Sequence, residues 1–423
     1  MKEDFLHYIW KYKLFSLTNL ETVNKEVVTI VNSGIHNKNA GPDFLNAQLK
    51  LDNQLWAGNV EIHIKSSDWY AHNHETDANY DNVILHVVWE NDANIYMKNN
   101  QPLPTLVLNG LVSNTILQNY NSLLFAPQKW IPCEDFIKDV DSFTLSNWKE
   151  RLFFDRLERK ATTIKQLLAK ENNDFEAVLF QLLAKNFGLK INGDAFLRLA
   201  QSVDFAIIKK CSFKGLELAA LLFGQAGFLE TSLAHEYHAT LKKEYNYLKH
   251  KFGLESMSKN TFSFFRMRPN NFPTIRIAQL IGLFHKHQNL FSKVLAVQKL
   301  DDFYTLFSID VASFWKTHYN FESTSKTSAK KLTKSFIDLL IINTIIPLKF
   351  LYEQARGEVD ETFYLELLEN IKPEKNSIIT KFEVHKIFAK NAFDTQALLE
   401  LKNNYCLLKR CLECAIGVKV LGK

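Results

Sequence analysis

Residues 59–65 read NVEIHIK, a run in which polar and apolar side chains alternate and the apolar ones are β-branched. This pattern predicts a half-buried strand, because alternate side chains of a strand lie on the same face of a sheet. A carboxylate, an imidazole and an ammonium group, those of Glu61, His63 and Lys65, are therefore expected to line one face. The alternative is a solvated strand face on which these groups serve only solubility.

A second acidic residue, Asp43, stands in a context that can bring it next to Glu61. It follows Gly41-Pro42, which is typical of a turn, and it precedes the strand-like run at residues 44–51. A short loop at residues 52–54 leads into the strand that contains Glu61, so the two segments are predicted to form a hairpin. Two neighbouring carboxylates suit a hard divalent cation such as Mg²⁺ or Mn²⁺. His63 or Lys65 could then position a water molecule for hydrolysis.

Further histidines follow in the same region. His72 and His74 are two residues apart among polar neighbours, which places them in a loop or on one face of an extended segment, and this spacing is common among metal ligands. His86 lies in an apolar run at residues 83–89 that predicts a buried strand, where a histidine is more often a hydrogen-bonded core residue than a ligand. We regard these three side chains as candidate support for an active site. A zinc site centred on them and His63 is a separate hypothesis.

Composition divides the chain into an acidic and a basic part. The 423 residues allow two or more domains, and the 33 phenylalanines indicate a large aromatic core. Residues 1–125 carry 8 Lys, no Arg and 13 Asp plus Glu, a net charge of −5, so residues 126–423 carry a net charge of +10 within the total of +5. An acidic module followed by a basic one fits a metal site next to a phosphate-binding surface, although lysine-rich helices often need no partner.

The period of the apolar residues changes after residue 125. A helix at residues 4–15 and several short strands are expected before that point, whereas apolar residues recur at helical spacing beyond it. We therefore predict an α+β protein, with a mixed α/β module at residues 1–125 and a basic all-α domain at residues 126–423. Helices are expected at residues 148–168, 175–187, 195–202, 216–229, 233–252, 275–287, 330–351, 361–371 and 395–404.

A loop in the helical part contains three arginines, Arg266, Arg268 and Arg276, and enters a helix at Thr274. Guanidinium groups near a helix N-terminus suit a phosphate group, so these residues are candidates for nucleic-acid binding. The alternative is that they pair with carboxylates and hold two helices together.

The chain shows neither a secretory signal nor a clear membrane span. Its N-terminus lacks a charged segment followed by an apolar one. The most apolar run, residues 336–351, is interrupted by Asp338, Asn343 and Pro347, and it predicts a buried helix. We therefore expect a cytoplasmic protein without a membrane partner, in which cysteines are metal ligands or free thiols more often than disulfides.

Three of the five cysteines, Cys406, Cys411 and Cys414, form a Cys-x4-Cys-x2-Cys pattern. Three thiols this close suggest a tetrahedral zinc ion or an iron–sulfur cluster that lacks one ligand. Cys133 lies in a turn-rich segment and is a better candidate for the fourth ligand than Cys211. Ligands that are all sulfur do not decide between zinc and a [4Fe–4S] cluster. The alternative is that three reduced cysteines pack in a C-terminal helix.

The pair Pro42-Asp43 and the triplet Glu61-Ile62-His63 resemble the PD-(D/E)XK nuclease superfamily. That superfamily pairs an aspartate, often after proline, with an acid-x-lysine triplet on the next strand, and the expected order of helix, strand, hairpin and strand fits its core. His63 stands where the superfamily has lysine, and Lys65 could substitute for it. The resemblance implies a restriction-endonuclease-like module and a metal-dependent nuclease acting on nucleic acid, with DNA as the first candidate.

The four cysteines also look like the iron-staple arrangement of some helicase-associated and CRISPR-associated nucleases of that superfamily, although there the lone cysteine precedes the nuclease core. The chain as a whole resembles a bacterial family catalogued as domain of unknown function 2851, which brings no established activity. The alternative to a nuclease is a non-catalytic nucleic-acid-binding or assembly protein on a degenerate nuclease scaffold, and the missing lysine favours it. The segments that carry the resemblance to the bacterial family are residues 41–44, 60–63, Trp69 with His72 and His74, 85–88, 266–269 and the cysteine-rich end.

Overall fold

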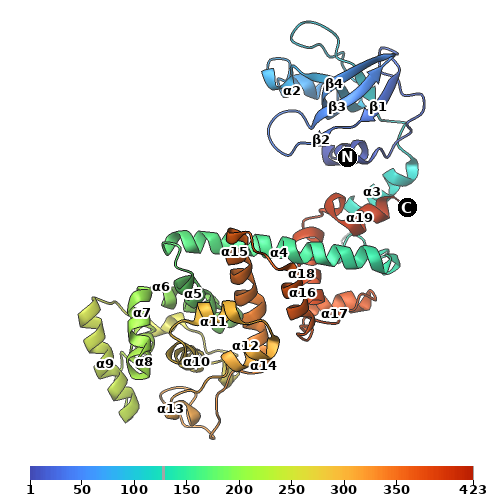
Figure 1. Cartoon of the computed structure of the whole chain (residues 1–423). Coiled ribbons are helices and arrows are strands. Elements are labelled where there is room, and N and C mark those ends of the chain that lie inside the picture. Colours follow the sequence, from blue (N-terminus) through green and yellow to red (C-terminus); the bar gives the residue numbers. More distant parts are fainter. Residues whose placement is uncertain (126–128, 423) are drawn as a thin grey trace. The chain divides into compact units, whose positions relative to one another are not determined.

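The computed structural model describes residues 1–125 and 129–422, and it has a mixed sheet near the N-terminus followed by helices (Figure 1). The predicted α+β class is therefore confirmed. The chain divides into two compact units, described separately below. Unit 1 comprises Met1–Trp148, Val384–Ile387 and Glu400–Lys423, and unit 2 comprises Lys149–Glu383 and Phe388–Leu399. The expected domain boundary at residue 125 lies inside unit 1.

The sheet of unit 1 has the strand order β1-β3-β4-β5-β6, and the short strand β2 also pairs with β3. β1, β3 and β4 are antiparallel, whereas β4, β5 and β6 are parallel. The elements up to the end of the sheet are α1 (Glu3–Tyr12), β1 (Val28–Asn32), β2 (Ile35–His36), β3 (Phe44–Leu51), β4 (Gln54–Lys65), α2 (Asp68–Ala71), η1 (Ala78–Tyr80), β5 (Val83–Glu90) and β6 (Thr105–Val107).

The predicted hairpin is present as β3 and β4. Phe44 pairs with Val60 in antiparallel register, so Asp43, one residue earlier, lies opposite Glu61. The register shifts between Phe44 and Ala47, where Asn46 has a φ of 58°, as expected for a β-bulge. The bulge therefore lies directly after the pair that sets Asp43 opposite Glu61.

The parallel pair of β4 and β5 places Glu61 beside His86. The two strands approach each other closely at Gly58, because a Cβ there would lie 2.4 Å from Ile84 Cγ2 and 2.6 Å from the carbonyl oxygen of Asn82. The amide of Asn59 donates a hydrogen bond to the same carbonyl, at 2.8 Å. Only glycine leaves room for this contact, which holds β4 against β5 just before the segment in which Glu61 pairs with His86.

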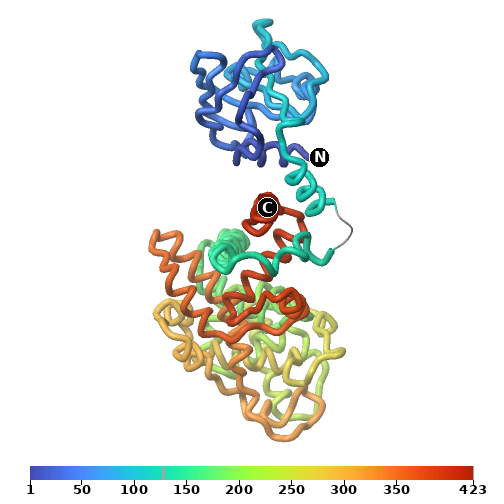
Figure 2. The backbone as a smooth tube through the Cα atoms, turned by 90° about the vertical axis from the view of Figure 1, so that its right-hand side faces the viewer, coloured from blue at the N-terminus to red at the C-terminus, as the bar shows by residue number. Residues whose placement is uncertain are grey.

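The rest of unit 1 joins residues near position 130 with the end of the chain. Helices α3 (Asn114–Phe125) and α19 (Ala415–Leu421) lie side by side, and Asn119 Nδ2 donates to the Val420 carbonyl at 3.2 Å (Figures 1 and 2). The C-terminal segment therefore packs onto segments that precede all of unit 2 in the sequence. Its other elements are η2 (Ile137–Asp139), the π-helical turn η6 (Leu401–Cys406) and η7 (Cys411–Glu413).

Unit 2 is helical, and each helical segment expected within residues 148–404 overlaps a helix of the structure. Short helices such as α7, α11 and α12 were not expected. The helices are α4 (Ser142–Lys170), which begins in unit 1, α5 (Phe175–Phe187), α6 (Leu189–Gln201), α7 (Phe205–Ser212), α8 (Gly215–Gln225), α9 (Glu236–Phe252), α10 (Pro273–Lys286), α11 (Leu290–Ala296), α12 (Leu300–Leu306), α13 (Ser313–Lys316), α14 (Lys334–Leu340), α15 (Ile346–Arg356), α16 (Glu361–Glu369), α17 (Ser377–Val384) and α18 (Ala392–Glu400).

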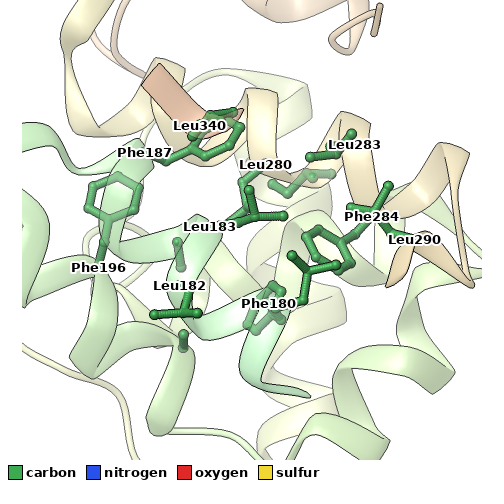
Figure 3. Close-up of a cluster of buried hydrophobic side chains, with 14 of the residues drawn as sticks. Phe180, Leu182, Leu183, Phe187, Phe196, Leu280, Leu283, Phe284, Leu290 and Leu340 are labelled. Atoms are coloured by element: carbon green, nitrogen blue, oxygen red, sulfur yellow. The ribbon is translucent and has the colours of Figure 1, made fainter. Parts of the chain in front are cut away.

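The core of unit 2 is rich in phenylalanine, as the composition indicated. Phe180 and Phe284 meet edge to face with ring centroids 4.8 Å apart, and Leu183 and Leu280 fill the space beside them (Figure 3). Within the described residues, one continuous helical stretch, Lys334–Arg356, is long and apolar enough to cross a membrane, but 72% of its most apolar window is buried inside the protein. The prediction of a buried core helix is therefore confirmed.

We expect Gly58→Ala to destabilise unit 1 by about 1–3 kcal/mol, because the new methyl group overlaps Ile84 and the Asn82 carbonyl. Gly422→Ala is the matched control, since its Cβ would meet its nearest neighbour at an ordinary 3.6 Å. Urea unfolding followed by circular dichroism measures both. Equal midpoints for the two variants would contradict the close approach of β4 and β5.

Candidate metal centre

The carboxylates of Asp43 and Glu61 are held together by the hairpin. The amide of Asp43 donates to Glu61 Oε2 at 3.1 Å, and the amide of Ile62 donates to Asp43 Oδ2 at 3.0 Å. Each carboxylate thus accepts a backbone hydrogen bond from the other strand. Glu61 is only 5% exposed, and burial raises the pKa of its carboxyl above the usual value. The expected meeting of these two residues is confirmed.

Three imidazoles gather at the other oxygen of Glu61. Glu61 Oε1 lies 3.3 Å from His74 Nε2 and 3.5 Å from His63 Nε2, and His63 Nε2 lies 3.1 Å from His72 Nδ1. Among the residues that the structure describes, His63, His72 and His74 form the one group of three or more potential ligands whose donor atoms lie within 4.8 Å of one another.

These separations match the edges of a small coordination tetrahedron. Zinc binds imidazole nitrogen and carboxylate oxygen at about 2.0–2.2 Å, so two ligands on one ion stand about 3.3 Å apart. The three distances in the cluster, 3.1, 3.3 and 3.5 Å, fall around that value. The residues present therefore fit a divalent metal ion with imidazole and carboxylate ligands.

A turn at the end of α2 brings His72 and His74 to the same place. The amide of His72 donates to the Asp68 carbonyl at 2.9 Å, and the amide of His74 donates to the Trp69 carbonyl at 3.0 Å. Between the two histidines, Asn73 adopts a φ of 59°, a left-handed conformation that asparagine tolerates better than most residues. Of the two settings expected for this pair, the loop is correct.

His86 supports His63 from the neighbouring strand. His63 Nδ1 lies 2.9 Å from His86 Nε2, and both side chains are buried. Burial and the neighbouring imidazoles lower the pKa of His63 to about 3, and burial likewise lowers the pKa of His86 well below its usual value. When the Nδ1 of His63 carries the proton and donates to His86, its Nε2 presents a lone pair to His72 and Glu61, which is how second-shell partners orient metal ligands.

Aromatic rings close one side of this cluster and leave another side open. The Tyr80 ring stacks on His74 with centroids 3.7 Å apart, and Trp69 lies edge-on to His74 at 5.4 Å. Trp69 is 1% exposed, whereas His72 is exposed to solvent. A substrate or a water molecule can therefore reach the cluster from the side of His72.

A second histidine pair, which the sequence patterns did not reveal, flanks Asp43. His7 Nε2 on α1 lies 3.2 Å from Asp43 Oδ2, and His36 lies next to His7 with ring centroids 5.4 Å apart. Burial lowers the pKa of His7, but the carboxylate of Asp43 outweighs it and the pKa of His7 is raised. Glu3 is close enough for burial and the Asp43 charge to raise its pKa as well. The spacing of Glu3 and His7, one helical turn apart, was the available signal.

Lys65 does not join the centre. It is exposed at the end of β4, two residues beyond His63, and its backbone amide donates to Asp68 Oδ2. Within the described part of the chain, no contact links its ammonium group to Asp43 or Glu61. The structure thus brings together Asp43, Glu61, His63, His72, His74 and His86 and leaves Lys65 outside.

The predicted arginine cluster is only partly formed. Arg266 and Arg268 are exposed in the loop before α10. Arg276 lies within α10 and is 7% exposed, with its guanidinium 3.7 Å above the Phe336 ring and hydrogen-bonded to Gln279 and Asn271. Burial lowers the pKa of Arg276 to about 10. Arg276 is therefore a core residue, and the expectation that all three guanidinium groups face a phosphate is corrected.

Four of the five cysteines lie in unit 1, in segments that follow the strands of the sheet in the sequence. Cys133 precedes η2, Cys406 ends η6, Cys411 begins η7 and Cys414 immediately precedes α19. All four are buried and free. Cys211, in contrast, belongs to α7 of unit 2. The structure thus places Cys133 in the same unit as the C-terminal three cysteines.

Comparison with known proteins assigns the chain to a family without assigning an activity. No curated protein and no solved structure matches it. One family model, described as Protein of unknown function (DUF2851), matches residues 3–377, which is most of the chain. The chain therefore belongs to the DUF2851 family.

Proposed function

We propose that this protein is a metal-dependent hydrolase that cleaves phosphodiester bonds of nucleic acid, with DNA as the first candidate substrate. The observation that carries the proposal is the group of three imidazoles of His63, His72 and His74, whose donor atoms lie within 4.8 Å of one another, with Glu61 Oε1 3.3 Å from His74 Nε2 and 3.5 Å from His63 Nε2. An imidazole-rich set favours Zn²⁺ or Mn²⁺ over the Mg²⁺ expected from two carboxylates alone. Such an ion, when bound, would acidify a water molecule and polarise a phosphoryl oxygen.

Glu61 is the side chain best placed to move a proton. Its Oε2 is fixed by the Asp43 amide, and its Oε1 faces the imidazoles of His63 and His74. Because burial raises its pKa, the carboxylate is a stronger base than an exposed glutamate and can accept a proton from an attacking water molecule. In this arrangement the three histidines would hold the ion, and the ion would supply an acidified water molecule to Glu61, as in catalytic zinc sites.

His7 can supply the positive charge that Lys65 does not. Its raised pKa favours the protonated imidazolium, which Asp43 holds at 3.2 Å. A cation at this point would stabilise negative charge that develops on a phosphate, the task that the nuclease resemblance gives to lysine. With this assignment His7, rather than Lys65, would supply the cation that the nuclease pattern takes from lysine.

The nucleic-acid part of the proposal is supported by the order of the elements and by charge. Helix α1, the antiparallel strands β1, β3 and β4, and the parallel strand β5 follow the order expected for a PD-(D/E)XK module. The excess of basic residues after position 125 and the exposed Arg266 and Arg268 suit a polyanion.

The alternative is a binding or assembly protein in which the metal is purely structural. One observation favours it: Glu61 Oε1 stands at ligand distance from His63 and His74, so it could complete a tetrahedral sphere and leave no position for water. Closed spheres of four protein ligands are typical of structural zinc sites. The role of Glu61, base or fourth ligand, therefore separates the two functions.

We expect His74→Ala to lose one equivalent of bound Zn²⁺ or Mn²⁺ relative to the wild type, because it removes one of three imidazole ligands. His250→Ala, at an exposed position of α9, is the control and should retain the wild-type metal content. Metal analysis by mass spectrometry after dialysis measures both. Equal metal content in the two variants would contradict a histidine site.

Glu61→Gln keeps the shape of the side chain and removes its basicity. If Glu61 is the base, the variant keeps its metal and loses cleavage of labelled DNA by about 10²–10⁴-fold. Glu90→Gln, an exposed residue of β5, should cleave like the wild type. Loss of metal together with activity would assign Glu61 as the fourth ligand and support the structural alternative. Unchanged cleavage would overturn the hydrolase mechanism.

Replacing Arg266 and Arg268 with alanine should weaken binding to nucleic acids of any sequence. The plot of the logarithm of the binding constant against the logarithm of the salt concentration should also become less steep, by about 0.9 for each phosphate that is no longer neutralised. Lys243→Ala with Lys249→Ala on the exposed side of α9 removes the same charge elsewhere and is the control. Fluorescence anisotropy with labelled single- and double-stranded DNA at several salt concentrations measures the slopes. Identical slopes in both double variants would remove the arginine loop from the binding surface.

A further inference from the structure

Four buried thiols, contributed by two segments that are far apart in the sequence, lie together in unit 1. Cys133, Cys406, Cys411 and Cys414 are each less than 10% exposed, and none forms a disulfide. Every pair among the four is close enough for the charge of one thiolate to raise the pKa of another thiol. Four cysteines that gather in the interior, at a distance from solvent and without covalent pairing, form a set of soft ligands for a metal.

The backbone is built to bring these cysteines close. Cys411 begins η7 and Gly417 lies in α19, and a Cβ at Gly417 would be 2.1 Å from the Cys411 carbonyl oxygen. Only glycine permits this approach. On the other side, Lys402 Nζ donates to the Trp130 carbonyl at 2.5 Å, which anchors η6 near the loop that carries Cys133.

The groups around the thiols suit a negatively charged centre. Burial raises the pKa of each thiol, and nearby donors act against it. The backbone amides of Gly417 and Ile416 lower the pKa of the Cys414 thiol, and the ammonium groups of Lys402 and Lys409 lower the pKa of Cys406 and Cys411 in turn. Amide and ammonium donors stabilise the charge of metal-bound thiolates.

The sulfur atoms do not stand as close together as the ligands of one zinc ion. A single zinc ion with four sulfur ligands at about 2.3 Å would hold them about 3.8 Å apart. Among the described residues, no three cysteine sulfur atoms lie within 4.8 Å of one another. A polynuclear cluster places its own iron and sulfide atoms between the cysteines, and so accommodates sulfur atoms that are farther apart than zinc ligands.

We propose that Cys133, Cys406, Cys411 and Cys414 bind a [4Fe–4S] cluster. The cluster joins the segment around residue 133 to the C-terminal segment 400–423, two parts of unit 1 that the whole of unit 2 separates in sequence. Its role is to hold the end of the chain in place, and it does not depend on the proposed hydrolase activity. The cluster and the histidine centre use different ligands and different metals.

The test is the iron and acid-labile sulfide content of the full chain purified without oxygen. We expect brown protein with about four iron and four sulfide atoms per chain, and a paramagnetic signal after reduction. Cys414→Ser should lose most of both, whereas Cys211→Ser, at a buried cysteine outside the group, should retain both. His74→Ala should also retain the iron, which separates this result from the fate of the histidine centre.

A second measurement covers the case in which Cys414→Ser does not fold. Wild-type protein stripped of metal is reconstituted with ferrous iron and sulfide, and the protection of residues 400–423 against proteolysis is followed. We expect reconstitution to restore four iron atoms and to protect the C-terminal segment. Stoichiometric zinc without iron, equal iron loss in Cys211→Ser, or a reconstituted chain that takes up no iron would each overturn the proposal.

Discussion

The burial of Glu61 is the constraint on which the N-terminal sheet depends. A carboxylate that leaves water costs several kcal/mol unless donors replace its hydration. Here one oxygen receives the Asp43 amide and the other faces His74. The register of the β3–β4 hairpin, which sets Asp43 opposite Glu61, and the turn after α2, which brings His74 to the same carboxylate, both supply this compensation. The hairpin and the turn thus both help to stabilise the buried charge of Glu61.

The same burial keeps the imidazoles of His63 and His86 neutral. His63 and His86 have strongly lowered pKa values because their charged forms would lie in the interior next to other imidazoles. A neutral imidazole has a lone pair to offer, and metal binding requires that form. Neutral histidines beside a buried carboxylate are therefore costly for a core that only has to pack, but they suit a core that holds an ion.

Much of this arrangement follows from the sequence, and the rest depends on long-range packing. The alternation in residues 59–65 and the turn at Gly41-Pro42 were enough to predict the hairpin and the meeting of Asp43 with Glu61. Period-two reasoning placed Lys65 on the face of Glu61 and His63, but it does not show that the strand end is exposed. Similarly, the proximity of Arg276 to two other arginines in sequence concealed its position on the buried face of α10.

His7 and Cys133 show where local sequence patterns fail to identify a residue and where they suffice. The role of His7 depends on how α1 packs against the sheet, an arrangement of distant segments that local pattern does not encode. Cys133 stood out as a candidate despite its separation from the other cysteines, because few residue types can serve as a fourth soft ligand and only five cysteines were available, and the structure places it in the same unit as the other three. Chemistry restricts the choice of partners when the ligand type is rare. Histidines and carboxylates are common enough that their partners emerge only from the fold.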